Sequence, residues 1–292
     1  MMRVRIEGEM RKNEPLSRHT SIRTGGPADY FFIPVHRTDL LRVMRAIEKS
    51  ALPYFIMGDG TNLLFSDEGF RGCVIKLGKG FETLKFAGSR VSAGSGLQLS
   101  RLIHESATNS LSGLERLCGI PGTVGGAANT NAGAYGAQFA DVIESVKGVD
   151  RRGKPILLSR DEIEFGYRNA VYPKEIAIIE VELKLTQGSA SRSSRLMDEC
   201  LRKRKETQPW GEATAGCVFK NPSPNVPAGR LIEECGLKGT MVGDALISSK
   251  HANFIINRGT ATTAQVSELI QLVVDEVRAK KGIELRLEVE IV

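Results

Sequence analysis

The sequence predicts an α+β protein built from three parts that each mix helix and strand. Its 292 residues are too many for one small hydrophobic core. The chain opens with a helix followed by short strands, and it closes with a strand of alternating apolar and polar residues. Apolar residues make up 41% and charged residues 25%, as in soluble globular proteins. We expect the parts to be residues 1–79, 80–187 and 188–292.

The first part begins with a helix that opens at Thr38 and ends before Pro53. One face is apolar at helical spacing, through Leu40, Val43, Met44 and Ile47. Residues 54–57 then predict a buried strand that ends in a glycine-bearing turn, residues 58–62. A second strand follows at residues 74–77, and we interpret roughly the first eighty residues as a small α/β unit.

The second part predicts strands at residues 91–93, 142–149, 156–158 and 176–185, and a helix at residues 99–107. Residues 187–194 are polar and predict a linker.

In the third part, a basic helix at about residues 195–206 stops at Pro209. Thr262 and Gln265 form a capping box for a long helix, and Gly282 stands where its C-terminal glycine belongs. Residues 284–291 predict the last strand, with the four charged residues on one face and the four apolar residues on the other.

Charge and cysteine content narrow the class of protein. The N-terminus lacks the apolar segment of a signal peptide, and no run of eighteen apolar residues could span a membrane. Five scattered cysteines without metal-ligand spacing indicate free thiols, no metal site and a cytoplasmic protein. The net charge of +6 suits an anionic ligand, but no aromatic-interleaved basic patch predicts nucleic acid.

The most unusual stretch is residues 119–136, GIPGTVGGAANTNAGAYG, in which six of eighteen residues are glycine and none is charged. Glycine and proline oppose a helix here, so we expect a repeatedly turning backbone. Bare N–H groups of such a backbone can cradle phosphate oxygens, and a tightly packed core loop is the equally weighted alternative. Residues 23–26 and 58–62 are further candidates, and none of the three fits a P-loop or a Rossmann fingerprint.

Three side chains could carry chemistry. Arg168 follows an aromatic pair and could clamp a carboxylate, although a surface arginine is the simpler interpretation. Cys217 follows a glycine, with Lys220 and Asn221 just beyond, and could donate a proton, whereas most free cysteines are buried and inert. Glu288 lies in the last strand, and spacing alone does not separate it from Glu284 or Glu290.

Six segments, taken together, resemble the UDP-N-acetylenolpyruvoylglucosamine reductase family. They are residues 19–28 (HTSIRTGGPA), 57–72 (MGDGTNLLFSDEGFRG), 119–136, 165–168 (FGYR), 208–222 with its QP and AGCVFKNP elements, and 251–255 (HANFI). They occur in family order and span nearly the whole chain.

The resemblance implies a fold and two redox partners. Two N-terminal subdomains of the vanillyl-alcohol-oxidase type (PCMH type) would bind FAD non-covalently, and a C-terminal α/β domain would bind a UDP-linked amino sugar. Hydride would pass from NADPH to the flavin and then to an enolpyruvyl ether, giving UDP-N-acetylmuramate for peptidoglycan synthesis. We expect a monomer without nucleic-acid or membrane partners.

The resemblance also implies the site. Arg168 would stabilise the enolate, Cys217 would donate the proton, Glu288 would assist as the catalytic glutamate, and Lys220 and Asn221 would touch substrate. The residues expected to bind the cofactor come from the two glycine-bearing segments: Gly58, Gly60, Thr61, Asn62, Leu63, Gly119, Ile120, Pro121, Gly122, Thr123, Gly125, Gly126, Asn131 and Ala132.

Two features depart from the family pattern. The proton donor is most often serine, whereas Cys217 is a more acidic and oxidisable thiol. The end reads LRLEV where relatives often read LEPEV, which favours Glu288 over Glu290. Little room for an extra tyrosine-bearing loop after Arg168 indicates the shorter class. The alternatives are another FAD-dependent oxidoreductase or oxidase of the same fold, or a non-catalytic nucleotide-binding protein.

Overall fold

The computed structural model describes residues 4–292, and the chain divides into two compact units. The first comprises the described residues up to 12 together with residues 30–58 and 72–203, and the second comprises residues 13–29, 59–71 and 204–292. The chain therefore passes between the units several times. The three-part division predicted above remains a prediction.

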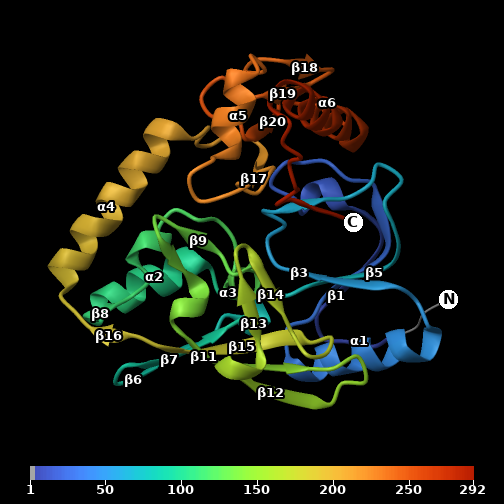
Figure 1. Ribbon diagram of the computed structural model, residues 1–292. Helices are drawn as coiled ribbons and strands as arrows, with labels where there is room; N and C mark the ends of the chain where they lie inside the picture. Colours follow the sequence, from blue (N-terminus) through green and yellow to red (C-terminus); the bar gives the residue numbers. More distant parts are fainter. Residues whose placement is uncertain (1–3) are drawn as a thin grey trace. The chain divides into compact units, whose positions relative to one another are not determined.

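An antiparallel sheet of order β12-β11-β15-β7-β6 organises most of the first unit. Helices α2 and α3 lie over it (Figure 1), and contacts link α3 with β15 and β7. The elements of this sheet region are β6 (Leu84–Ala87), β7 (Arg90–Gly94), α2 (Leu99–Thr108), α3 (Val124–Thr130), β11 (Ile143–Val149), β12 (Pro155–Ser159) and β15 (Ala177–Lys184).

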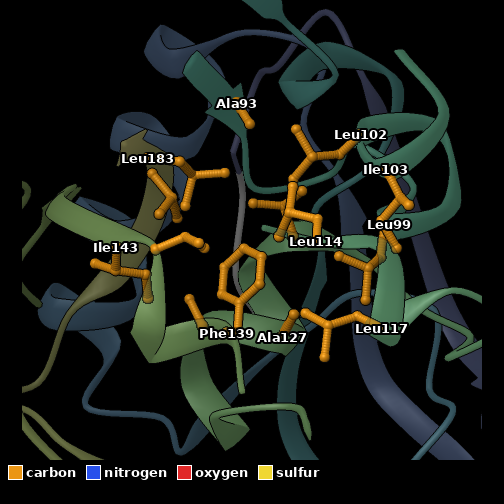
Figure 2. Packing of buried hydrophobic residues seen from close by; sticks show 14 of the residues in the cluster. Ala93, Leu99, Leu102, Ile103, Leu114, Leu117, Ala127, Phe139, Ile143 and Leu183 are labelled. Carbon is orange, nitrogen blue, oxygen red and sulfur yellow. The ribbon is translucent and has the colours of Figure 1, made fainter. Parts of the chain in front are cut away.

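The core of this region lies where apolar residues of α2 and α3 meet the sheet. Figure 2 shows Phe139 among side chains that point toward one another, with Ile143 and Leu183 from strands and Leu99 from α2. Phe139 is fully buried in a short 3-10 turn, Phe139–Asp141. The glycine-rich stretch thus runs directly into the packed core.

Three short antiparallel pairs complete this sheet region. They are β8 (Leu111–Ser112) with β16 (Thr186–Gln187), β9 (Gly133–Ala134) with β10 (Ala137–Gln138), and β13 (Glu164–Gly166) with β14 (Asn169–Val171). The remaining 3-10 turns are Leu16–Arg18, Lys79–Phe81, Glu115–Leu117 and Arg160–Glu162.

A second sheet has the order β1-β2-β5-β3, with β1 (Glu9–Pro15), β2 (Pro27–Ile33), β3 (Tyr54–Met57) and β5 (Phe70–Lys76). Strands β3 and β5 are parallel, and α1 (Arg37–Ser50) connects β2 to β3. The apolar face of α1 is buried in one cluster with Phe32, Cys73 and Ile75. The predicted helix and the two strands after it are therefore present, and β2, which was not predicted, precedes the helix.

The second unit is built on a sheet of order β17-β20-β19-β18, on which α6 (Thr263–Lys281) packs. Helix α6 has the expected capping box, and Gly282 ends it in the left-handed conformation at φ 66°. Helix α4 (Ala190–Thr207) carries the chain into this unit. The other elements are β4 (Leu63–Leu64), β17 (Thr214–Cys217), α5 (Ala228–Glu234), β18 (Met241–Val242), β19 (Ala245–Ile247), β20 (Phe254–Asn257) and β21 (Glu290–Ile291).

Three sequence expectations were wrong. Residues 187–194 do not form the predicted linker. Helix α4 begins at Ala190, and the buried Ser193 donates a hydrogen bond to Glu115. The final strand is only Glu290–Ile291, paired in parallel with β4, and residues before it make one isolated bridge, Leu287 with Phe219. The glycine-rich stretch also contains the seven-residue helix α3, whose N-terminus Thr123 caps.

Candidate active site

Residues 119–136 form a turn, the helix α3 and a tight hairpin in succession. Thr123 accepts a hydrogen bond from the Gly126 amide at 3.3 Å, while the Val124 and Gly125 amides donate to the carbonyls of Leu97 and Ser95. Within residues 4–292, the main-chain N–H groups of Gly119, Gly122 and Thr123 donate to no backbone carbonyl. Open amides therefore lie ahead of the helix, in the part of the stretch that turns.

Gly58, the residue after β3, lies against this segment. A β-carbon added to Gly58 would stand 2.3 Å from Oγ1 of Thr123, so only glycine allows the approach. The Gly60 and Asn62 amides also donate to no backbone carbonyl in the described chain, and Gly60 has φ 64°. Close main-chain approach and open amides are what a dinucleotide pyrophosphate requires, so these residues fit FAD.

The remaining predicted cofactor residues differ in exposure. Ile120 packs at the edge of the core and Pro121 is exposed, whereas Ala132 is buried and Leu63 is buried in β4. Thr61 is half-buried, and its carbonyl lies beside Gly216, the residue before Cys217.

Arg168 lies in the two-residue turn of the β13–β14 hairpin. Gly166 pairs with Asn169 across the turn, and Arg168 has φ 53°, in the left-handed region. Its guanidinium carbon lies 5.4 Å from the centre of the Tyr167 ring. Cation–π contact and a constrained backbone hold this cation in place.

Cys217 ends β17 and is the only half-buried cysteine; the other four are buried. The backbone just beyond it is fixed by Asn253, whose Nδ2 donates to the Phe219 carbonyl at 2.8 Å and whose Oδ1 accepts from the Phe219 amide at 2.9 Å. The buried N–H and C=O groups of Phe219 therefore both have a hydrogen-bond partner. The sequence placed Asn253 in a motif without giving it this role.

Glu288 lies in the same unit and on a neighbouring segment. Its amide donates to the carbonyl of Val218, the residue after Cys217, at 2.8 Å. Asn62 donates from Nδ2 to the Glu288 carbonyl at 3.0 Å, and the Asn62 carbonyl accepts from the Glu290 amide at 3.0 Å. The glycine-bearing turn and the residue after Cys217 are thus both joined to the Glu288 segment through hydrogen bonds.

The two residues expected to touch substrate follow Cys217. The Lys220 amide donates to the Arg286 carbonyl at 2.8 Å. Asn221 accepts the Ala228 amide at 3.0 Å on its Oδ1, at the start of α5. Both side chains are half-buried.

The predicted residues fall into two groups. Gly58, the 119–136 residues and Arg168 lie in the first unit, whereas residues 60–63, Cys217, Lys220, Asn221 and Glu288 lie in the second. Residues 23–26 have a packing role, because a β-carbon on Gly26 would stand 2.1 Å from the Asp67 carbonyl oxygen.

Two kinds of feature are missing from residues 4–292. No cluster of three or more histidine, cysteine or acidic side chains there could hold a metal ion. No helix in the same range is sufficiently long and apolar to cross a membrane.

The fold and its similarity to known families together define an FAD-dependent oxidoreductase. Residues 28–159 match the FAD binding domain family, and residues 208–292 match the family described as UDP-N-acetylenolpyruvoylglucosamine reductase, C-terminal domain. The expected order of an FAD-binding module and a distinct C-terminal domain is confirmed.

Relatives match along the whole chain. A UDP-N-acetylenolpyruvoylglucosamine reductase of Caldanaerobacter subterraneus is 40% identical over 98% of this chain and 94% of its own. The reductase 2 of Symbiobacterium thermophilum is 43% identical over 99% of this chain and 94% of its own. The crystal structure of UDP-N-acetylenolpyruvylglucosamine reductase (MurB) from Thermus caldophilus superposes with a TM-score of 0.85 at 38% identity, covering 98% of this chain and 99% of that one. The chain belongs to the UDP-N-acetylenolpyruvoylglucosamine reductase family.

Proposed function

We propose that Arg168, Cys217 and Glu288 carry the proton and charge chemistry of this chain's reaction. Family membership makes the protein an FAD-dependent oxidoreductase that reduces UDP-N-acetylenolpyruvoylglucosamine with NADPH, a step of peptidoglycan synthesis. The observation that carries this function is similarity of about 40% identity over nearly the full length of both chains. The same-fold oxidase is the first alternative above, and the spectroscopic experiment below distinguishes it from the reductase.

The Arg168 guanidinium would stabilise the negative charge that develops during the reaction. When bound and reduced by NADPH, the flavin would supply a hydride to the terminal carbon of the enolpyruvyl ether. Negative charge then builds toward the adjacent carboxylate as an enolate, and a preorganised guanidinium stabilises it. The constrained turn and the Tyr167 ring beside Arg168 support this role, because a cation that is already in position needs no reorganisation during the reaction.

The carbon next to the carboxylate must then receive a proton. Cys217 is the one half-buried thiol, which supports its role as the donor. Glu288, held beside the Cys217 segment through the Val218 carbonyl, would assist by stabilising the enolate or acting as an acid. Half-buried Lys220 and Asn221 would contact the nucleotide sugar.

The cofactor would lie along the two glycine-bearing segments. The open amides of Gly119, Gly122, Thr123, Gly60 and Asn62 support pyrophosphate binding. Division into FAD-binding subdomains 1–79 and 80–187 and a substrate domain 188–292 belongs to the same proposal. Acid denaturation should release free FAD, and colour retained on the chain would show a covalent flavin instead.

The protein would act as a cytoplasmic monomer without nucleic-acid or membrane partners. Five cysteines without a disulfide suit a reducing compartment. Light scattering over a range of protein concentrations should give one mass near 31.8 kDa, and a concentration-independent dimer would contradict the monomer.

Anaerobic flavin spectroscopy tests the function directly. NADPH should bleach the yellow flavin, and UDP-N-acetylenolpyruvoylglucosamine should restore the colour without oxygen. Recovery with oxygen alone would identify an oxidase and overturn the assignment. Bound flavin that NADPH does not reduce would instead indicate the non-catalytic protein, with its flavin site kept as a relic.

A further inference from the structure

Asn131 ends helix α3 in the middle of the glycine-rich stretch, and its side chain is directed into the protein. It is 1% exposed, and its backbone has φ 46° and ψ 59°, the left-handed conformation. Among residues with a side chain, asparagine adopts this conformation unusually readily. Backbone geometry alone would thus admit asparagine or glycine here.

The amide of Asn131 uses both of its donors and its acceptor within the first unit. Nδ2 donates to the Gly166 carbonyl at 2.8 Å and to Oε1 of Gln138 at 2.9 Å, and Oδ1 accepts from the Ala140 amide at 3.0 Å. Glycine would supply the backbone shape but none of these bonds. The side chain therefore serves the protein's own geometry and does not need a bound ligand to be satisfied.

One of these bonds reaches the hairpin that carries Arg168. Gly166 is the residue that pairs with Asn169 at the base of the turn, so its carbonyl orientation sets the plane from which Tyr167 and Arg168 project. A second bond ties the same segment to α3, since the Tyr172 hydroxyl donates to the Ala128 carbonyl at 3.1 Å. Hairpin and helix are thus held together at both ends of β14.

We infer that Asn131 is a positioning residue that orients Arg168 relative to the glycine-rich cofactor stretch. This inference rests on the enolate role proposed for Arg168. The substrate carbon that accepts the hydride would be bound at the flavin, which the glycine-rich stretch holds. Because the Arg168 hairpin is fixed to the same stretch, the distance between this carbon and the guanidinium would stay constant. Misplacement by about 1 Å can cost a hundredfold in rate, so a single buried amide can matter this much.

The half-reactions of the holoenzyme separate positioning from folding. Asn131→Gly keeps the left-handed backbone and removes all three side-chain bonds. Stopped-flow reoxidation of the reduced flavin by UDP-N-acetylenolpyruvoylglucosamine should slow by ~10- to 100-fold. Reduction by NADPH should slow less than reoxidation, because Arg168 has no part in it.

Two further variants keep the inference falsifiable. Asn131→Asp retains the size and the acceptor for Ala140 but loses both donors, and it should slow the same half-reaction if Asn131→Gly does not fold. Gln138→Ala removes one partner of Nδ2 but spares Gly166, and it should slow reoxidation by less than about threefold. Equal slowing by Gln138→Ala would show that Gly166 is not the partner that matters.

A double-mutant cycle and hydrogen exchange supply independent readouts. If Asn131 acts through Arg168, then Asn131→Gly should add little to Arg168→Ala in the reoxidation rate. Amide exchange in the peptide covering residues 164–171 should quicken in the Asn131→Gly holoenzyme. Additive effects, unchanged exchange there, or equal slowing of both half-reactions would overturn the inference. Wild-type flavin that is not reoxidised by the substrate would instead refute the proposed function.

Discussion

The guanidinium of Arg168 lies directly against the backbone of Gly133. A β-carbon added to Gly133 would stand 2.8 Å from Nη1 of Arg168 and 2.9 Å from the Ala137 carbonyl oxygen. Side-chain carbons essentially never approach so closely, so position 133 has to be glycine for the arginine to lie where it does. The glycine-rich stretch therefore leaves room for a cation from another hairpin as well as presenting amides.

Replacing Gly133 by alanine should displace Arg168 and slow the step that needs it. We expect Gly133→Ala to lower the rate of substrate-dependent flavin reoxidation by at least tenfold, with NADPH reduction little changed. Gly166→Ala is the matched control in the same hairpin, because its β-carbon would meet only the Asn169 β-carbon at 4.0 Å. A Gly133→Ala enzyme with wild-type reoxidation would show that the contact does not position Arg168.

Cys217 should be replaceable by serine but not by alanine. We expect Cys217→Ala to lose at least tenfold in the reoxidation half-reaction, or about 1.4 kcal/mol of barrier, because the donor of the proton is gone. Cys217→Ser keeps an O–H donor and should retain more activity than Cys217→Ala. Stopped-flow measurement with the same substrate compares the two variants, and equal rates for wild type and Cys217→Ala would remove Cys217 from the mechanism.

A chemical control distinguishes a reacting thiol from a packed one. Only Cys217 is not buried, so mild peroxide should oxidise it before the other four cysteines. Peroxide should then inactivate the wild type while sparing Cys217→Ser. Equal inactivation of both would place the sensitive group elsewhere.

The periodicity of apolar residues predicted those helices and strands whose buried residues recur regularly within one short segment of the sequence. The spacing of Leu40, Val43 and Ile47 predicted helix α1. The apolar residues at 54–57 predicted strand β3, and those at 99–107 predicted helix α2. The prediction of a linker was wrong because the polar residues around Ser193 were expected to be exposed to solvent. Its burial depends on Glu115, 78 residues away, which accepts its hydroxyl at 2.6 Å.

Tertiary contacts also decided what the glycine-rich stretch became. Glycine propensity argued against a helix, yet α3 forms because Thr123 caps it and Val124 and Ala128 are fully buried in the core. The motifs indicated Arg168, Cys217 and Glu288 as candidates. The supporting roles of Gly133, Asn131 and Asn253 depend on hydrogen bonds and clearances that no linear spacing encodes.

Asn253 should contribute stability to the segment that follows Cys217. Asn253→Ala leaves the buried Phe219 amide and carbonyl without their partners, and unsatisfied buried groups cost about 1–3 kcal/mol each. We expect urea unfolding to show a loss of about 2–4 kcal/mol. Exposed Asn225 offers a control, because Asn225→Ala should stay within about 0.5 kcal/mol of wild type. A similar loss for the two variants would argue against a specific role for Asn253.

Asp39 should make the stability of the first unit depend on pH. Its fully buried carboxylate accepts the amides of Glu7 at 3.1 Å, Gly8 at 2.9 Å and Val35 at 3.4 Å. Burial opposes the charged form, but these three bonds and nearby Arg42 outweigh it and hold the pKa of Asp39 below its ordinary value. The folded state therefore binds this proton less readily than the unfolded state. The contribution is present at neutral pH and is lost as pH falls from the ordinary value through the lower folded pKa.

Replacing Asp39 by asparagine tests both the bonds and the sign. An asparagine side chain has one carbonyl oxygen, so its Nδ2 would face at least one amide donor, and we expect a loss of about 1–3 kcal/mol at pH 7. Because the amide of the variant cannot ionise, the difference between wild type and Asp39→Asn should shrink as urea unfolding is repeated at pH 7, 5 and 3. Asp198→Asn, at an exposed position, should stay within about 0.5 kcal/mol of wild type at pH 7. A difference for Asp39→Asn that stays constant or grows toward pH 3 would show that the charge of Asp39 is not what the three amides stabilise.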